Sequence, residues 1–251
     1  MAKRRGKPTG SKRPAGWRPQ RITAQRIEEG WAGPGSSVIR LVRASEADAV
    51  IDLLRLAGEE PEAMVGEAIR RDSVAGFLKR ALDQTPQVLT TELESVIRSG
   101  GDRLLELATG LGLVLVAVDP EGQIVGALLA HPPSGFLGRL VEQGLPWPHM
   151  LVAHTAVAKL KALAVAPSAR KSGIGGALLR RCSQVYWQCG YLLMFGQFAS
   201  ERQGLGEFYA KQGFTVVPAG AGIDMQVIFG RPVWLHPDGD EQGFFRWRPR
   251  S

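Results

Sequence analysis

Residues that mark secreted, metal-binding or membrane-spanning proteins are scarce in this sequence. Only two cysteines, Cys182 and Cys189, and four histidines occur among 251 residues. The cysteines fall seven residues apart on one predicted helix, so we expect two buried thiols rather than a disulfide or a metal pair. No apolar run is long enough to cross a bilayer, and the N-terminus has no apolar signal core. These absences favour a cytoplasmic protein without membrane contact.

Acidic residues are absent from residues 1–27, which hold nine of the 31 Lys and Arg residues. The rest of the chain has 22 basic and 24 acidic groups, so the net charge of +7 arises at the N-terminal end. We expect residues 1–37 to form a disordered basic tail, because the first twenty residues have little apolar surface to bury. Residues 1–27 could contact nucleic acid weakly through its phosphates, or could serve only as a solubilising extension.

A strand, a turn and a helix are predicted one after another near the middle of the chain. Residues 160–165 are short, apolar and bounded by Pro167, which is typical of a strand. Residues 173–189 carry apolar side chains at helical spacing. The turn between them is therefore expected to lie at the N-terminus of a helix.

This turn is rich in glycine and in positive charge. Gly173, Gly175 and Gly176 have no Cβ, so the backbone N–H groups at the helix start can approach a ligand closely. A helix N-terminus also favours an anion, and Arg170 and Lys171 add positive charge there. The turn therefore predicts a phosphate-binding site.

The spacing of the motif restricts which phosphate ligand is expected. Lys171 and Ser172 precede the glycines, whereas a P-loop needs them afterwards, and Leu178 stands where a dinucleotide fingerprint needs glycine. Residues 170–175 instead read Arg-x-x-Gly-x-Gly and follow the strand that ends in Ala-Pro. This arrangement resembles the acyl-CoA-binding motif of the GNAT acyltransferase superfamily.

A second motif lies further along the chain. Residues 191–198 are predicted to form the next strand, and Ser200 is expected to cap a short helix. Residues 208–214 read Phe-Tyr-x-x-x-Gly-Phe, which resembles the end of that helix in the same family. The two motifs together extend the resemblance over residues 159–217, with weaker similarity back to residue 38.

The resemblance implies an α/β fold in which a central mixed β-sheet is flanked by helices over residues 38–251. Further strands are predicted at residues 38–43, 113–118, 124–130, 215–218, 233–235 and 244–247. Ser45 is predicted to cap the first helix. Residues 58–110 are longer than the family needs and predict a helical insertion of several short helices, with Asp72 and Thr91 as caps. Residues 132–155 are predicted to form a loop or a partly helical lid.

The activity implied by the resemblance is acyl transfer to a primary amine, which attacks a thioester directly. The partner molecules would be acetyl-CoA, or another acyl-CoA, and an amine acceptor. Catalysis would depend mainly on positioning the reactants and supporting the oxyanion. The expected cofactor-binding residues are Leu163, Ala164, Val165, Arg170, Lys171, Ser172, Gly173, Ile174, Gly175 and Gly176.

Proton transfer requires an acid and a base in this reaction. Tyr209 matches the position where many relatives have a tyrosine as general acid toward the sulfur of CoA, and a phenol is a donor at neutral pH. Relatives often carry a glutamate on the cofactor-binding strand, where this chain has Lys159 and Lys161. By side-chain chemistry His154, and also His131, are candidate bases, and water could carry the proton instead.

Three properties stay open at this point. The acceptor could be a small molecule, a peptide N-terminus or a protein lysine, the acyl chain length is not specified, and exposed sheet edges would permit a homodimer. An alternative function is a nucleic-acid- or ribosome-associated protein that uses the basic tail and keeps the CoA-binding fold as a sensor or scaffold.

Overall fold

The computed structural model describes residues 21–58, 62–99, 109–133, 144 and 147–250. The first twenty residues of the predicted tail lie outside this described part. Residues 21–37 lie within it and correct the prediction that the tail ends at residue 37. Ile27 and Trp31 are buried there, and the Ile22 N–H donates to Gln188 Oε1 over 2.7 Å. The folded body therefore includes this segment, which contacts the β2 strand (Val38–Leu41) and the α4 helix (Gly76–Asp83) and is hydrogen-bonded to Gln188.

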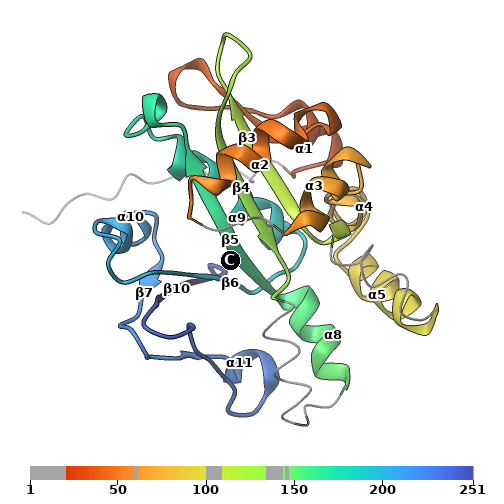
Figure 1. The fold of residues 1–251 in the computed structure, drawn as a ribbon. Helices are drawn as coiled ribbons and strands as arrows, with labels where there is room; N and C mark the ends of the chain where they lie inside the picture. The colour runs from red at the N-terminus through yellow and green to blue at the C-terminus, as the bar shows by residue number, and fades with distance from the viewer. Residues whose placement is uncertain (1–20, 59–61, 100–108, 134–143, 145–146, 251) are drawn as a thin grey trace, which may run out of the picture.

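Helices and strands of the described residues follow one another as Figure 1 shows. The helices are α1 (Ala24–Glu29), α2 (Ala47–Arg55), α3 (Ala63–Arg70), α4 (Gly76–Asp83), α5 (Gln87–Ser99), α8 (Trp147–Ala156), α9 (Ile174–Gln188), α10 (Leu205–Lys211) and α11 (Gln226–Phe229). The strands are β1 (Trp31–Ala32), β2 (Val38–Leu41), β3 (Leu113–Val118), β4 (Ile124–His131), β5 (Val157–Val165), β6 (Leu193–Phe198), β7 (Thr215–Val216), β8 (Ile223–Asp224), β9 (Trp234–Leu235) and β10 (Gln242–Trp247).

The central sheet has the strand order β1-β2-β3-β4-β5-β6-β10-β7. All neighbouring strands are antiparallel except β5 and β6, which are parallel. The predicted mixed α/β fold is thus confirmed, together with the hairpin of β3 and β4. The expectation that residues 233–235 complete this sheet is wrong, because β9 pairs with β8 in a separate two-stranded sheet.

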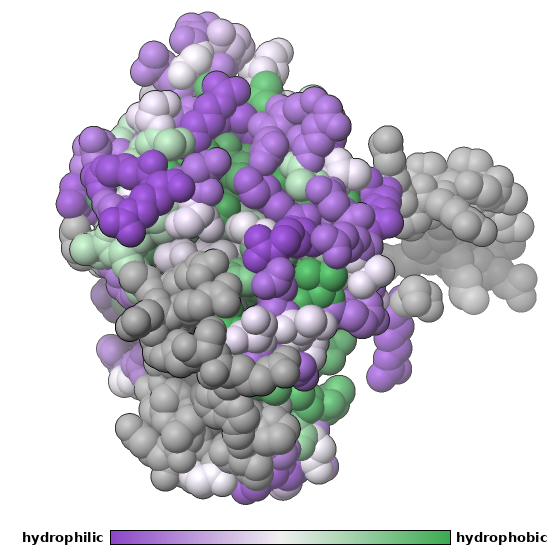
Figure 2. Space-filling model, turned by 90° about the vertical axis from the view of Figure 1, so that its right-hand side faces the viewer, coloured by the Kyte–Doolittle hydropathy of each residue, from purple (hydrophilic) through white to green (hydrophobic). Residues whose placement is uncertain are grey.

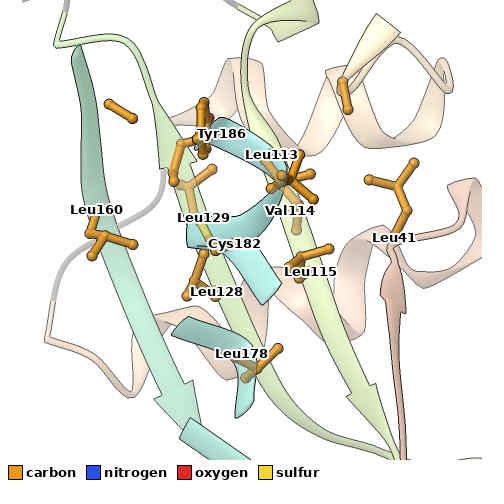
Figure 3. Packing of buried hydrophobic residues seen from close by; sticks show 14 of the residues in the cluster. Leu41, Leu113, Val114, Leu115, Leu128, Leu129, Leu160, Leu178, Cys182 and Tyr186 are labelled. Carbon is orange, nitrogen blue, oxygen red and sulfur yellow. The ribbon is translucent and has the colours of Figure 1, made fainter. Parts of the chain in front are cut away.

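Helices cover both faces of the sheet. Figure 1 shows α2 in front of β4 and α9 behind it, and both helices contact this strand. A Cβ atom on Gly126 of β4 would lie 2.7 Å from Ile174 Cγ2, so the missing side chain lets α9 approach closely. Figure 3 shows Leu178 and Cys182 of α9 among the leucines of β3 and β4. Both cysteines are buried free thiols, as predicted.

The predicted helical insertion corresponds to α3, α4 and α5, but its predicted caps are wrong. Asp72 has a φ of +52° and lies before α4, whose N-cap is Ala75. Thr91 lies inside α5, where its hydroxyl donates to the Gln87 carbonyl. Capping motifs of two or three residues recur by chance, and tertiary packing decides which of them begins a helix.

The surface over this helical side is mainly hydrophilic. Figure 2, which views the molecule from the right-hand side of Figure 1, shows apolar residues there only in small separate areas of the described surface. Among the described helices, none is both long enough and apolar enough to span a bilayer.

A buried ion pair, rather than the predicted Ser45 cap, organises the start of α2. Glu46 Oε1 lies 2.5 Å from Arg40 Nη2, and Glu46 Oε2 accepts from the Arg43 N–H over 2.8 Å. The side chains are only 6% (Arg40) and 17% (Glu46) exposed. Burial by itself would raise the pKa of Glu46, but the hydrogen bonds and charges of Arg40 and Arg43 outweigh it and lower that pKa.

We expect Glu46→Gln to lower the free energy of unfolding by about 3 kcal/mol, because it leaves the Arg40 charge buried without its counter-ion. The native pKa of Glu46 is lowered, so this stabilisation is complete above the unfolded pKa of about 4.3 and is lost as the pH falls through the native pKa. Urea unfolding at neutral and acidic pH measures both effects. Asp52→Asn is the control, because the Arg55–Asp52 pair is exposed and worth about 0.5 kcal/mol. Equal losses in the two variants would contradict the prediction.

Candidate functional site

The two parallel strands β5 and β6 pair over only part of their length. Their register joins Val157 to Leu193, Ala158 to Met194 and Lys159 to Phe195, and ends there. Beyond this point β5 continues along β4 as far as Val165. The C-terminal half of β5 therefore has a strand neighbour on one side only, and its other edge faces an opening in the sheet.

A cleft of about 470 Å³ occupies this opening. Its walls come from residues 160–165 of β5, the end of β6, α10 and the segment after α2. Arg170 and Tyr209 line it, and so does Arg202. Gly58, which has a φ of +90°, gives the Arg202 guanidinium room, since a Cβ atom there would lie 1.9 Å from Arg202 Nη2. The cleft thus has an apolar strand edge and two guanidinium groups.

The glycine-rich turn lies at one end of the cleft. Lys171 and Gly173 have φ angles of +63° and +91°, which turn the chain sharply into α9. No described residue accepts a hydrogen bond from the backbone N–H groups of residues 171–176. Arg170 Nε donates to the Val165 carbonyl over 3.2 Å and so holds the turn against β5. Six consecutive N–H donors and a helix N-terminus create a site suited to an anion.

Two glycines fit this turn against α10. A Cβ atom on Gly175 would lie 3.3 Å from Phe208 Cζ and 3.7 Å from Val165 Cγ2. On Gly176 it would lie 2.7 Å from Gln212 Oε1. Phe208 and Val165 also line the cleft, so the glycine-rich turn adjoins the cleft.

Tyr209 is held rigidly in the wall of the cleft. Its ring stacks on Phe244 of β10 with 3.6 Å between ring centroids, and it also contacts Phe198 and Phe208. Burial raises the pKa of Tyr209 well above its usual value. The phenol is therefore protonated at neutral pH.

The structure does not bring the predicted base into this cleft. His154 lies on α8, where its main-chain oxygen accepts from Tyr191 Oη over 2.8 Å, and it is not among the residues that line the cleft. His131 lines a separate cavity of about 50 Å³. Its Nδ1 lies 2.7 Å from the Pro132 carbonyl, and burial lowers its pKa. Both histidines are thus placed away from the turn and Tyr209.

The predicted helix cap after β6 is also wrong. Ser200 donates to the Asp240 carbonyl, and α10 begins after Gly204, whose φ is +81°. The hydroxyl therefore ties the end of β6 to the segment before β10. This contact joins residues forty positions apart, so local spacing could not reveal it.

The sequence analysis did not predict two polar residues of the cleft, Gln197 and Glu241. Both line the cleft, and Gln197 Nε2 donates to the Glu241 carboxylate and to Asp238 Oδ2, the latter over 3.0 Å. They meet because β10 pairs along β6, with Gln242 opposite Phe198. No motif in the sequence joins these positions, so only the pairing of the strands reveals the carboxylate in the cleft.

Comparisons with solved structures find acetyltransferases of low sequence identity. A ribosomal-protein-alanine N-acetyltransferase from Brucella melitensis is 20% identical, with a TM-score of 0.44, over 84% of this chain and 99% of that one. PaiA N-acetyltransferase from Thermoplasma acidophilum, in complex with coenzyme A, is 14% identical, with a TM-score of 0.44, over 85% and 99%. IAA acetyltransferase from Bacillus cereus is 14% identical, with a TM-score of 0.45, over 85% and 100%. The comparison with curated proteins gave no match.

A family model covers the part of the chain that builds the site. The model described as acetyltransferase (GNAT) domain matches residues 110–216. This range contains β5, the glycine-rich turn, α9 and α10, whereas the segment after α2 and Glu241, which also line the cleft, lie outside it. The match agrees with the resemblance of the two sequence motifs. Residues 110–216 of this chain are therefore similar to a GNAT acetyltransferase domain.

Proposed function

We propose that this protein transfers an acetyl group from acetyl-CoA to a primary amine, which attacks the thioester directly. The proposal rests on three features of the structure that adjoin one another. An open edge of β5, a cleft and a turn with six N–H donors lie side by side. A long ligand with amide groups at one end and phosphates at the other matches this order of features.

The described residues fit acyl-CoA at both ends. The edge of β5 at residues 160–165 would offer backbone groups to the amide-bearing arm, as an added strand does. The N–H groups of residues 171–176 and the Arg170 guanidinium would hold the pyrophosphate. Leu163, Val165 and Phe208 supply apolar surface between these ends. Each of the expected cofactor-binding residues lies in β5, in the turn or in the first turn of α9.

Direct transfer requires a proton donor for the departing thiolate. Acyl-CoA, when bound, supplies a thioester carbonyl that an amine can attack. Tyr209 lines the cleft with a protonated hydroxyl, and its ring is fixed between aromatic side chains. The raised pKa keeps the proton on Tyr209 at neutral pH, and the hydroxyl would donate this proton to the sulfur as the thiolate departs.

A proton acceptor for the amine is also required. In place of His154 we propose Glu241, because its carboxylate lies in the cleft and is oriented by Gln197. A carboxylate there would attract an ammonium group and then accept its proton, directly or through water. The acceptor would therefore be a cationic amine that enters from the side of the cleft where β10 begins.

Gly175→Glu tests the phosphate site, because it places bulk and negative charge beside the turn. We expect its Kd for acetyl-CoA to rise at least about tenfold, a loss of about 1.4 kcal/mol. Calorimetric titration of the full chain with acetyl-CoA measures this. Gly175→Ala is the control: its Cβ would touch Phe208 at 3.3 Å, and we expect a change of less than about threefold. If wild type failed to bind acetyl-CoA and CoA, the proposed function would be wrong.

Tyr209→Phe tests the general acid. We expect kcat to fall by about a hundredfold or more while the Kd for acetyl-CoA is unchanged, since the ring packing is kept and only the donor is removed. Steady-state kinetics on a small primary amine and calorimetry measure the two quantities. Tyr191→Phe is a matched control that removes another buried hydroxyl, bonded to the His154 oxygen. Tyr191→Phe should lower stability and keep kcat, and an unchanged kcat in Tyr209→Phe would rule out the acid role.

Glu241→Gln tests the base. The carboxylate must be deprotonated to act, so wild-type kcat/KM should decrease as the pH falls, and this acidic limb should be absent from the variant. We expect kcat/KM at neutral pH to fall about a hundredfold, with unchanged affinity for acetyl-CoA. Glu207→Gln on α10 is the control, because Glu207 is exposed and pairs with Lys211. If the variant keeps the wild-type limb, Glu241 serves only to orient Gln197.

A further inference from the structure

A second large hollow lies along the other half of α9. It has a volume of about 900 Å³ and is lined by α1, Trp31 of β1, the C-terminal half of α9 and Arg248. We call this hollow the arginine groove, after Arg21, Arg26, Arg181 and Arg248. It shares no lining residue with the cleft. Trp187 in the groove follows Gly175 by twelve helical residues, which places them about 18 Å apart along α9.

Four arginines and one described carboxylate line the arginine groove, so its described lining carries a net positive charge. No described carboxylate forms an ion pair with Arg21, Arg26, Arg181 or Arg248, although Glu29 also lines the groove. Burial lowers the pKa of Arg181, and the charges of Arg180 and Arg26 lower it further. The guanidinium groups therefore repel one another, and an anion placed between them would relieve that repulsion.

Three of these arginines, Arg21, Arg26 and Arg181, are held in place by neutral contacts. The Arg181 and Arg26 guanidinium groups lie 5.1 and 6.0 Å from the centre of the Trp31 ring. Arg181 Nη1 also donates to Gln184 Oε1 over 2.9 Å, and Arg21 Nη2 donates to the Leu82 carbonyl over 2.8 Å. Cation–π and carbonyl contacts orient a guanidinium and keep its charge, so little entropy is lost when it binds an anion.

The groove also holds a donor without an acceptor. Trp187 lines the groove, and its buried Nε1 atom makes no hydrogen bond to a described residue. Arg246 lies over the same indole ring at 4.8 Å and donates to the Gln212 carbonyl. A buried N–H without a partner costs free energy unless a ligand or water accepts from it.

We propose that the arginine groove binds the phosphodiester backbone of a single-stranded nucleic acid. A guanidinium group can donate two parallel hydrogen bonds to phosphate oxygens, and several guanidinium groups lie along this groove. Each nucleotide of a nucleic acid bears a charge, so successive phosphates of a single strand could contact successive arginines of the groove. This site does not depend on the proposed acyl transfer.

Binding of a fluorescein-labelled single-stranded RNA of about 20 nucleotides to the full chain tests the proposal by anisotropy between about 50 and 200 mM KCl. We expect Arg26→Gln/Arg181→Gln to weaken binding at low salt at least about tenfold. The slope of log K against log salt should become shallower by about 1.4, or 0.7 for each phosphate that the variant no longer neutralises. Arg248→Gln, at an exposed position, should reduce the slope by about 0.7.

Arg70→Gln/Arg71→Gln is the charge-matched control, because Arg70 pairs with Asp48 of α2 and Arg71 pairs with Glu67 of α3. It should bind RNA as wild type does, within about twofold. Unchanged acetyl-CoA affinity and melting temperature show that each variant is folded. Equal binding by the two double variants, or no RNA binding by wild type, would overturn the proposal. Polyglutamate that displaces the RNA equally well at equal charge would overturn the assignment to nucleic acid in favour of an acidic protein.

Discussion

The parting of β5 from β6 after three paired residues is the constraint on which the rest of this structure depends. β5 stays bonded to β4 as far as Val165, whereas β6 stays bonded to β10 along its whole length. The two strands thus belong to two well-paired halves that meet only at residues 157–159 and 193–195. Backbone groups on the open edge of β5 need water or a ligand, because buried N–H and C=O groups are rarely left without partners.

Aromatic packing keeps β6 and α10 on their side of this opening. Tyr209, Phe198 and Phe244 stack on one another, and Gly196 gives the Phe244 ring its place, since a Cβ atom there would lie 2.3 Å from Phe244 Cζ. The same stack fixes the Tyr209 hydroxyl in the cleft wall. The packing of β10 against β6 therefore holds the Tyr209 side chain in place at the opening.

Helix α9 links the two surfaces that are rich in positive charge. Its N-terminus carries the glycine-rich turn beside the cleft, and its C-terminal half contributes Arg181 and Trp187 to the arginine groove. The buried side of the helix packs on β3, β4 and β5. Polar groups at both of its ends are consequently fixed relative to the sheet, although they serve separate surfaces.

The local pattern of residues in the sequence was sufficient to locate several strands, helices and one turn of this protein. Periodicity located β5, α9 and the β3–β4 hairpin, because these elements bury one face and their apolar spacing reports it. The glycines and Arg170 located the turn that precedes α9, because positive φ angles and close approach restrict residue choice. Family resemblance placed Tyr209 on the helix that lines the cleft.

Only the tertiary structure decided which side chains meet across long sequence distances. It put residues 21–37 into the folded body, left His154 outside the cleft, and brought Glu241 beside Gln197 through the register of β10 on β6. It also gathered the arginines of α1, α9 and the C-terminal segment, whose spacing in the chain predicts no site. These contacts depend on strand pairing and helix packing between distant segments, and neither is encoded in any local pattern of residues.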